Sequence, residues 1–503
     1  MPKHGSNDLF RLIKSLSKTE KAYFKKFAER HVIGERNNYL KLFDAIDRQE
    51  VYDEKKLLRE EKYVKQLPYL KNYLMSAILK SMQVFHAELT EEDQQRRMME
   101  DARFFYKKGL YDLSAKITAK TRATASSRLI PTTFIDAVRL DERIITTTQD
   151  MELWKAHLAG TLPEERELLE DLLLYNELTG YFLEISRRVR SNDFTQLGKL
   201  RKALEAPVLA LLPKAKSFRC RTRALSALVM FHSLSGDYGR FYEYNKQLVG
   251  LYRTAVDYCR ENPDQYLRAL NNLCVACMTL KKFREGLKII AEIRSIRPTQ
   301  PDEERRIFLT AVNAELMLHL EAGNFEKTAE LFEQHQEKLQ EHLFTAFVQR
   351  YFILCGIGIE ANHYAGRYKA ALRLIAHTLS YTELNQFPWI KRAYEIYQIM
   401  VLHDMGSETA TFIRNLRRRS HAPIFDPYET ILLDYLEKSA EADEKKRRQL
   451  AEEAHRQVLR LKKDRIFYRL SSYIKLPAWL KSKATGEPFR ESLKATGWGM
   501  KMK

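Results

Sequence analysis

One short pattern recurs along the middle of this chain and constrains the fold more than any other feature. Each copy consists of an apolar helical stretch, a tight turn and a second apolar helical stretch. The turns are Gly236-Asp237-Tyr238, Lys281-Lys282-Phe283, Gly323-Asn324-Phe325 and Gly366-Arg367-Tyr368, with a weaker fifth at Gly406. Their first residues are 45, 42, 43 and 40 positions apart. A period in this range predicts stacked helix pairs, because one pair alone cannot bury its apolar face.

Composition agrees with a wholly helical chain. Gly (18) and Pro (14) are scarce among the 503 residues, so few turns of the kind that join strands are available. The 26 Tyr and 25 Phe residues supply a packed interior. A single compact core does not normally extend over so many residues, whereas a stack of helix pairs has no such limit, because each pair contacts only its neighbours. We therefore predict an all-α protein.

The copy around Gly323 shows why this pattern suits a helix pair. Apolar residues at helical spacing precede and follow the turn. A glycine ends the first helix there because a residue without a Cβ atom accepts the left-handed conformation. We expect Asn324 to cap the second helix and Phe325 to fill the junction between the two helices.

These copies resemble the tetratricopeptide repeat, whose hairpins carry Gly-x-Tyr/Phe at the turn and a small residue three positions later. Residues 222–416 match well and the rest of 91–426 weakly; Gly286, Thr328 and Ala371 fit the small site, and Phe241 does not. The resemblance implies a right-handed superhelical solenoid of antiparallel helix hairpins. Two features depart from the family. The period exceeds its ~34 residues, and larger residues replace the small one midway along the first helix: Val229, Cys274, Leu316 and Ile359. HEAT-type repeats fit the period better but lack this turn chemistry.

The regions outside the repeats have different patterns. We expect a basic helical module over residues 1–90, the repeats over 91–426, a helical cap over 427–480 and a mobile basic tail over 481–503. Within the first module, Ser17-Lys18-Thr19-Glu20 has the spacing of a capping box. The stretch Leu16-Ser17-Lys18-Thr19-Glu20 also looks a little like the start of some bacterial DNA-binding domains, but no three-to-four-residue glycine turn is followed by a recognition helix. The alternative is a plain helical cap on the solenoid.

In tetratricopeptide proteins the first helix of each hairpin lines the concave face. Carrying this register across the copies gives a set of candidate partner-binding residues: Arg223, Arg268, Asn271, Asn313, Met317, Glu360 and His363. Arg and Asn side chains are suited to the carbonyls or carboxylates of an extended peptide. The alternative is that these are ordinary exposed residues of the helices.

The formal net charge of +19 is concentrated at the two ends of the chain. Residues 1–90 hold 18 basic against 12 acidic residues, and residues 451–503 hold 13 against 5. Such an excess is typical of proteins with anionic partners, including nucleic acid. Two clusters are candidate anion-binding groups: Arg414, Arg417, Arg418 and Arg419, and Arg460, Lys462, Lys463, Arg465 and Arg469. The alternatives are favourable charge at a helix C-terminus and a solvated helix face.

Signals for catalysis, cofactors and metals are weak or missing in the sequence. Cys274-Val275-Ala276-Cys277 has C-x-x-C spacing, but it lies in an apolar helical stretch without a second pair, so we expect core packing. Gly356-Ile357-Gly358 follows no strand and is better explained by close helix packing. We expect no enzyme activity, no cofactor and no metal site. The five cysteines and the lack of a long apolar run favour a cytoplasmic protein without membrane insertion.

Together these patterns lead to two hypotheses from different classes. The first is a non-catalytic scaffold or adaptor that binds a peptide or protein in the concave groove of the repeats. The alternative is a nucleic-acid-binding regulator that uses its basic ends, with the repeats as a sensor.

Overall fold

The computed structural model describes most of the chain, and all of its regular elements are helical. The described residues are 7–30, 38–50, 52–61, 66–85, 91–128, 131–191, 197–298, 301–341, 347–419, 427–463 and 475–495. Within these ranges there is no strand, so the predicted all-α class is confirmed. No helix in the described ranges is long and apolar enough to cross a membrane.

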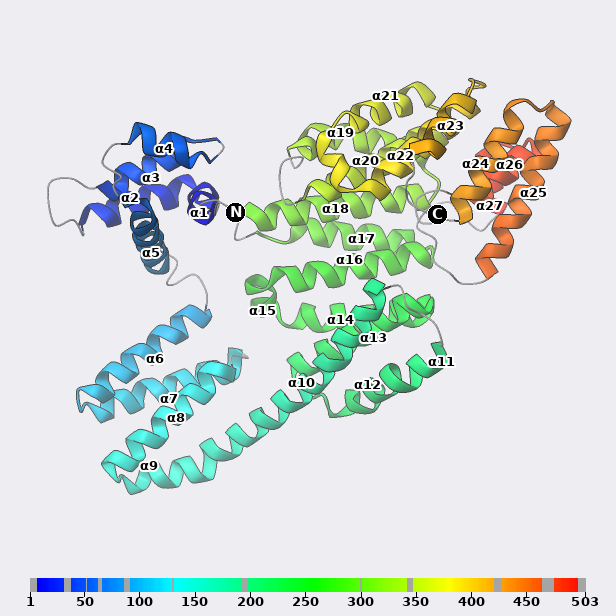
Figure 1. Ribbon diagram of the computed structural model, residues 1–503. Helices are drawn as coiled ribbons and strands as arrows, with labels where there is room; N and C mark the ends of the chain where they lie inside the picture. The colour runs from blue at the N-terminus through cyan, green and yellow to red at the C-terminus, as the bar shows by residue number, and fades with distance from the viewer. Residues whose placement is uncertain are drawn as a thin grey trace. The chain divides into compact units, whose positions relative to one another are not determined.

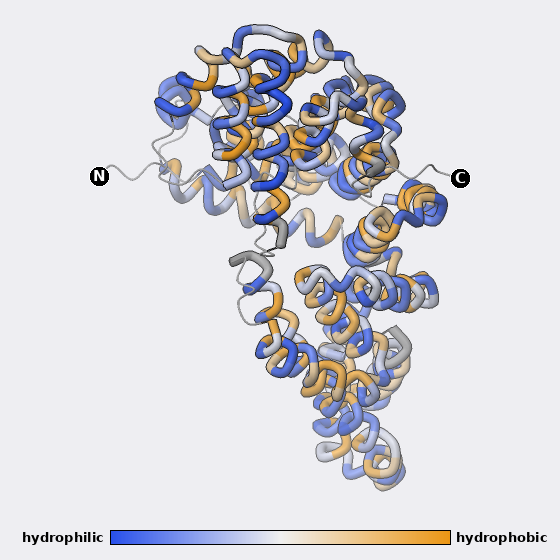
Figure 2. Tube along the Cα trace, turned by 90° about the vertical axis from the view of Figure 1, so that its right-hand side faces the viewer, coloured by the Kyte–Doolittle hydropathy of each residue, from blue (hydrophilic) through white to orange (hydrophobic). Residues whose placement is uncertain are grey.

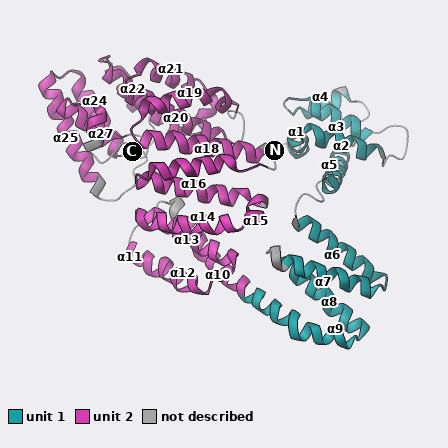
Figure 3. Cartoon of the chain, turned by 180° about the vertical axis from the view of Figure 1, so that it is seen from behind, with its two compact units in different colours: residues 1–170 teal, residues 171–503 magenta. Residues whose placement is uncertain are grey.

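The chain divides into two compact units, residues 1–170 and 171–503 (Figure 3). The boundary lies within the long helix α10, Leu162–Ser191. The sequence placed boundaries at residues 90, 426 and 480 instead, and those finer boundaries stay predictions.

The first unit contains nine helices before α10 in its described residues. They are α1 (Asp8–Ser15), α2 (Lys18–Arg30), α3 (Asn38–Arg48), α4 (Glu54–Glu60), α5 (Leu67–Phe85), α6 (Glu91–Lys107), α7 (Tyr111–Arg128), α8 (Pro131–Thr148) and α9 (Met151–Ala156), followed by a π-helical turn at His157–Thr161. The predicted capping box opens α2, since the Ser17 backbone N–H donates to Glu20 Oε2 at 2.6 Å and the Glu20 N–H donates to Ser17 Oγ at 3.2 Å. Helices α1 to α5 share one apolar core around Ile13, Phe24 and Phe43.

Helices α6 to α8 pack against one another around a second, smaller apolar cluster. Gly109 joins α6 to α7 with φ of 77°, and Gln149 precedes α9 with φ of 54°. A further segment with a turn-like sequence, Asn192-Asp193-Phe194, lies outside the described residues.

The second unit continues after α10 with helices of differing length. They are α11 (Leu197–Leu200), α12 (Ala206–Leu211), α13 (Phe218–Ser235), α14 (Tyr238–Thr254), α15 (Val256–Glu261), α16 (Pro263–Thr279), α17 (Phe283–Ser295), α18 (Pro301–Glu321), α19 (Phe325–Gln340), α20 (Val348–Tyr364), α21 (Tyr368–Leu379), α22 (Pro388–Asp404), α23 (Ala410–Arg419), α24 (Pro427–Ala440), α25 (Glu444–Lys463), α26 (Leu476–Thr485) and α27 (Phe489–Ala495). A π-helical turn at Arg201–Glu205 and 3-10 turns at Leu212–Lys214 and Thr382–Gln386 complete it.

All four recurrent turns join two helices that pack against each other: α13 with α14, α16 with α17, α18 with α19 and α20 with α21. Each turn has a left-handed first residue, with φ of 71° at Gly236, 59° at Lys281, 75° at Gly323 and 73° at Gly366. The weaker fifth turn at Gly406 has φ of 72°. One expected detail is wrong, because the Asn324 side chain makes no capping hydrogen bond.

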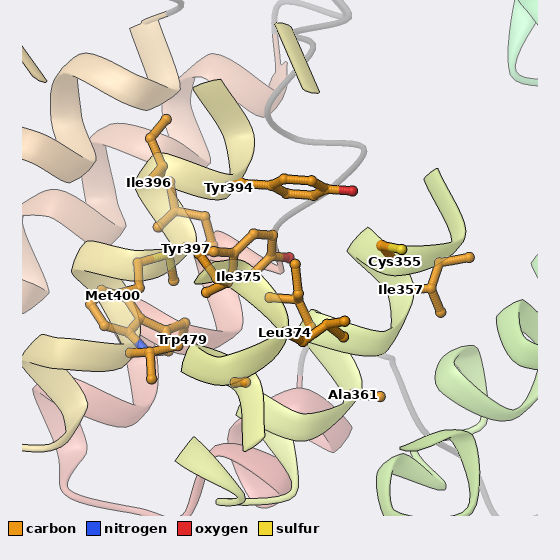
Figure 4. Packing of buried hydrophobic residues seen from close by; sticks show 14 of the residues in the cluster. Cys355, Ile357, Ala361, Leu374, Ile375, Tyr394, Ile396, Tyr397, Met400 and Trp479 are labelled. Carbon is orange, nitrogen blue, oxygen red and sulfur yellow. The ribbon is translucent and has the colours of Figure 1, made fainter. Parts of the chain in front are cut away.

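Alternate helices of this region also contact one another: α14 packs against α16, α16 against α18, α18 against α20 and α20 against α22. These five helices therefore form a row in which each lies beside the next (Figure 1). Apolar and polar residues alternate along many of the helices (Figure 2), as expected when one face is buried. The largest apolar cluster runs from α18 to α27, and it contains the buried residues of α20 and α22 drawn in Figure 4. Gly358 shows how closely these helices approach, since an added Cβ would lie 2.8 Å from the Phe332 ring.

The C-terminal residues differ from the expected mobile tail. Residues 481–485 end α26 and residues 489–495 form α27. Leu480 and Leu493 of these helices are buried in the large apolar cluster, and Phe489 stacks on Tyr364 at 4.3 Å between ring centroids. The basic composition suggested an unattached tail, but two apolar side chains and an aromatic ring are sufficient to dock a short helix. Residues 464–474, which belong to the helical cap expected over 427–480, lie outside the described part of the chain.

Candidate binding groove

A cavity of about 730 Å³ opens along one face of four alternate helices in the second unit, α16, α18, α20 and α22. We call it the groove. Residues spaced four apart, which share one helix face, form its walls: Val275 and Thr279 of α16; Asn313, Met317 and Glu321 of α18; Phe352, Gly356 and Glu360 of α20; and Trp389, Ala393 and Tyr397 of α22. The first helices of the later four recurrent pairs therefore share this cavity, which is mainly apolar and aromatic, whereas α13 contributes no residue to it.

One aromatic wall of the groove is held by a buried hydrogen bond. Tyr394 extends from α22 toward α20 (Figure 4), and its hydroxyl donates to the Phe352 carbonyl oxygen. Gly356 lies opposite this ring, where an added Cβ would stand 3.4 Å from Tyr394 Cε1. The lack of a side chain at Gly356 therefore lets the Tyr394 ring lie close to α20.

An ion pair occupies one end of the groove. Lys475, the residue before α26, places its Nζ 2.9 Å from Glu321 Oε1, and its backbone N–H donates to the Tyr364 hydroxyl at 3.1 Å. Burial raises the pKa of Glu321, and the charge of Lys475 opposes that rise. The start of α26 is thus tied to both α18 and α20, and it brings an amine into the groove.

Glu360 is the unusual group in this site. It is 6 % exposed, and its Oε1 atom has no hydrogen-bond partner among the described residues. Burial raises the pKa of Glu360 to about 7; Lys475 and Tyr364 lower it, and Glu321 adds to the rise. Relative to the left-handed turn residue, Glu360 occupies the same position as Met317 and Val275. A carboxylate therefore stands where the neighbouring helices carry apolar side chains.

The structure brings together three of the seven residues predicted for the concave face: Asn313, Met317 and Glu360. Arg223 lies elsewhere, with its guanidinium 4.9 Å from the Tyr175 ring centroid and 4.8 Å from that of Phe182.

Three further predicted residues do not line the groove. Arg268 is exposed and Asn271 is half-buried, both on α16. His363 is buried and lines a second cavity. Sequence reasoning missed Glu321 and Lys475. Glu321 follows Met317 by four residues, so extending the helical register would have found it, whereas no sequence pattern places Lys475 beside it.

The second cavity, of about 700 Å³, surrounds Asp404 at the end of α22. Asp404 accepts hydrogen bonds from His363 Nε2 at 2.9 Å and Trp479 Nε1 at 2.9 Å, and Lys483 Nζ lies 2.8 Å away. Burial alone would raise the pKa of Asp404, but hydrogen bonds from His363 and His403 and the charge of Lys483 hold it well below its usual range. This carboxylate joins α20, α22 and α26.

Beside the same cavity, a serine, a histidine and an aspartate contact one another in the order found in a hydrolase catalytic triad. His403 Nε2 lies 3.2 Å from Ser439 Oγ, and its Nδ1 lies 3.5 Å from Asp404 Oδ1. Ser439 is fully buried, does not line the cavity, and its hydroxyl donates to the Leu436 carbonyl at 3.1 Å. A nucleophile must reach its substrate, so this arrangement holds helices together.

The two basic clusters are only partly described. Arg414, Arg418 and Arg460 are exposed, and Arg417 forms ion pairs with Asp434 at 2.5 Å and Glu437 at 3.1 Å. The side chains of Arg419, Lys462 and Lys463 and all of Arg465 and Arg469 lie outside the described part. Binding of an anion by these clusters stays a prediction.

The C-x-x-C cysteines and the potential metal ligands can also be examined in the structure. Cys274 and Cys277 are fully buried in an apolar cluster, where burial raises the pKa of each thiol to about 12, so the expected core packing is confirmed. Among the residues that the structure describes, no group of three or more His, Cys, Asp and Glu side chains is arranged to hold a metal ion.

No family model matches this chain, and neither the curated proteins nor the solved structures include a significant match.

Proposed function

We propose that this chain is a cytoplasmic, non-catalytic interaction scaffold that binds an extended peptide or protein segment in the groove. In this proposal the helix pairs form a tetratricopeptide-like solenoid, with the first helix of each pair on the concave side. The observation that carries the proposal is the groove itself, because α16, α18, α20 and α22 contribute equivalent faces to one cavity.

The chemistry of the walls suits a peptide better than a small polar metabolite. Aromatic and aliphatic side chains such as Val275, Trp389 and Met317 offer contacts for apolar side chains. Asn313 offers an amide that can both donate to and accept from a peptide backbone. Repeated helix faces present such contacts at regular intervals, which is how helical-repeat proteins hold extended partners.

A display selection tests this proposal. Random twelve-residue peptides would be selected on the immobilised full-length chain, and the enriched peptides measured by fluorescence anisotropy. Asn313→Trp and Val275→Trp place an indole in the groove, and each should weaken binding at least about tenfold, a loss of ~1.4 kcal/mol. Arg268→Trp is the matched control, since Arg268 is exposed on α16 outside the groove.

Two results would count against the proposal. One is a selection that enriches no binding peptide. The other is a set of enriched peptides whose affinity is the same for the wild type and both groove variants. Circular dichroism melts of every variant would separate a blocked groove from a loss of folding.

A further inference from the structure

The groove contains one carboxylate oxygen, Oε1 of Glu360, that has no hydrogen-bond partner among the described residues. Glu321 is paired with Lys475 at 2.9 Å, but Glu360 Oε1 accepts no hydrogen bond among the described residues although the side chain is buried. A buried acceptor without a partner destabilises the folded protein. Such a group is explained when a ligand supplies the missing partner.

We propose that the partner segment carries a basic side chain, arginine or lysine, and that Glu360 pairs with its charged group inside the groove. This inference rests on the proposed peptide-binding function and names the side chain that the groove selects. The nearby Glu321–Lys475 pair shows that an amine and a carboxylate fit side by side at this end of the cavity.

The surroundings of Glu360 favour this pairing. The charged and titratable groups that face it are Glu321 from α18, Tyr364 from its own helix, Tyr397 from α22 and Lys475 before α26. Lys475 is already bonded to Glu321, and no salt bridge to Glu360 is present among the described residues, so Glu360 has no ion-pair partner of its own when it is ionised. The aromatic rings of Trp389 and Tyr397 line the same cavity and suit the stem and charge of a basic side chain.

Because Glu360 gains or loses a proton near neutral pH, the inference can be tested by measuring peptide affinity at different pH values. Burial raises the pKa of Glu360 to about 7, so the groove is largely neutral at this position at pH 6 and negatively charged at pH 8. A cation binds only the ionised form strongly. The affinity for a basic peptide should therefore rise about tenfold from pH 6 to pH 8, while that for a neutral peptide should not change.

The experiment compares two seven-residue peptide pools with the full-length protein. Arginine is central in one pool and its neutral isostere citrulline in the other, and the flanking positions are randomised among Ala, Leu, Phe and Ser. Peptide retained in ultrafiltration is measured by mass spectrometry. At pH 8 the wild type should retain the arginine pool about tenfold over the citrulline pool. The protein's net charge of +19 opposes any non-specific preference of this kind.

Variants locate the effect and separate this inference from the proposed function. Glu360→Gln should retain both pools equally, whereas Glu304→Gln, at an exposed position of α18, should keep the arginine preference. An arginine preference that survives in Glu360→Gln, or that does not change between pH 6 and pH 8 in the wild type, overturns the assignment.

The remaining outcomes distinguish the two levels of the proposal. Equal retention of both pools by the wild type, lost in Asn313→Trp, overturns the basic-residue inference and supports peptide binding in the groove. If the wild type retains neither pool, both the inference and the proposed function fail.

Discussion

At the scale of single residues, Glu360 has the clearest energetic consequence. The folded pKa of about 7 lies above the unfolded value of about 4.5, so the folded state holds the proton more tightly. The resulting stabilisation is complete below about pH 4.5 and is lost as the pH rises through 7, because ionisation then places a charge in a buried site. A group that lowers stability at neutral pH is typical of a functional site.

Replacing this carboxyl with an uncharged amide should therefore stabilise the protein at high pH. From pH 5 to pH 8, we expect the unfolding free energy of Glu360→Gln to gain about 2 kcal/mol relative to wild type. Urea unfolding at both pH values, followed by circular dichroism, measures this difference. Glu304→Gln, at an exposed position, should follow the wild type at both pH values. A constant difference between Glu360→Gln and wild type would show that the carboxyl does not titrate in this range.

At the scale of elements, the turns and the docking of α26 determine how the helices meet. The left-handed turn residue is glycine in four of the five recurrent turns and lysine at position 281, where φ is 59°. A residue with a Cβ atom pays about 1–2 kcal/mol for that conformation. The stability of the α16–α17 pair is therefore lowered by its own turn.

Relieving this turn should stabilise the protein. We expect Lys281→Gly to raise the unfolding free energy by about 1 kcal/mol. Glycine adopts the left-handed conformation without strain, and this relief exceeds the larger conformational entropy that glycine loses on folding. Arg284→Gly, within α17, should instead lower stability by up to about 1 kcal/mol. Chemical unfolding of both variants makes the comparison, and a loss of stability in Lys281→Gly would contradict it.

Helix α26 is held by Trp479, which is 1 % exposed and donates to Asp404. Removing the side chain in Trp479→Ala should cost about 3–5 kcal/mol. Trp479→Phe keeps much of the packing but loses the hydrogen bond to a charged group, so a loss of about 1.5–3 kcal/mol is expected. The control is Phe412→Ala, at a 42 % exposed position of α23, which should change stability by less than about 1 kcal/mol. If both Trp479 variants lost no more stability than Phe412→Ala, α26 would not be part of the core.

At the scale of the whole molecule, the excess of positive charge raises the question of nucleic acid. Arg417 is already paired with Asp434 and Glu437, so part of one basic cluster is neutralised within the fold. We expect mixed-sequence duplex DNA, single-stranded DNA and RNA to bind weakly at low salt and to dissociate near physiological salt, as measured by fluorescence anisotropy.

The opposite result would favour the regulator hypothesis. If sub-micromolar binding persisted at physiological salt, charge reversal of Arg414 and Arg418, whose side chains are exposed, should weaken it and reduce the salt dependence. An equal affinity of wild type and reversed variant would assign the binding to another surface.

The sequence alone determined the helical class, the positions of the recurrent turns and the capping box of α2. These features depend on local physics: glycine accepts positive φ, Ser and Glu close a capping box across three residues, and apolar side chains at helical spacing bury one face. The register of the helices also placed Asn313, Met317 and Glu360 on a face that lines the groove.

Only the tertiary structure decided which distant groups meet. Lys475 reaches Glu321 across 154 residues, and Trp479 reaches Asp404 across 75. The docking of α26 and α27 depends on how the surfaces of α18, α20 and α22 combine, and no local pattern encodes that combination. The same long-range packing surrounds Glu360 with apolar side chains, which is why its pKa and its missing partner become visible only in the folded protein.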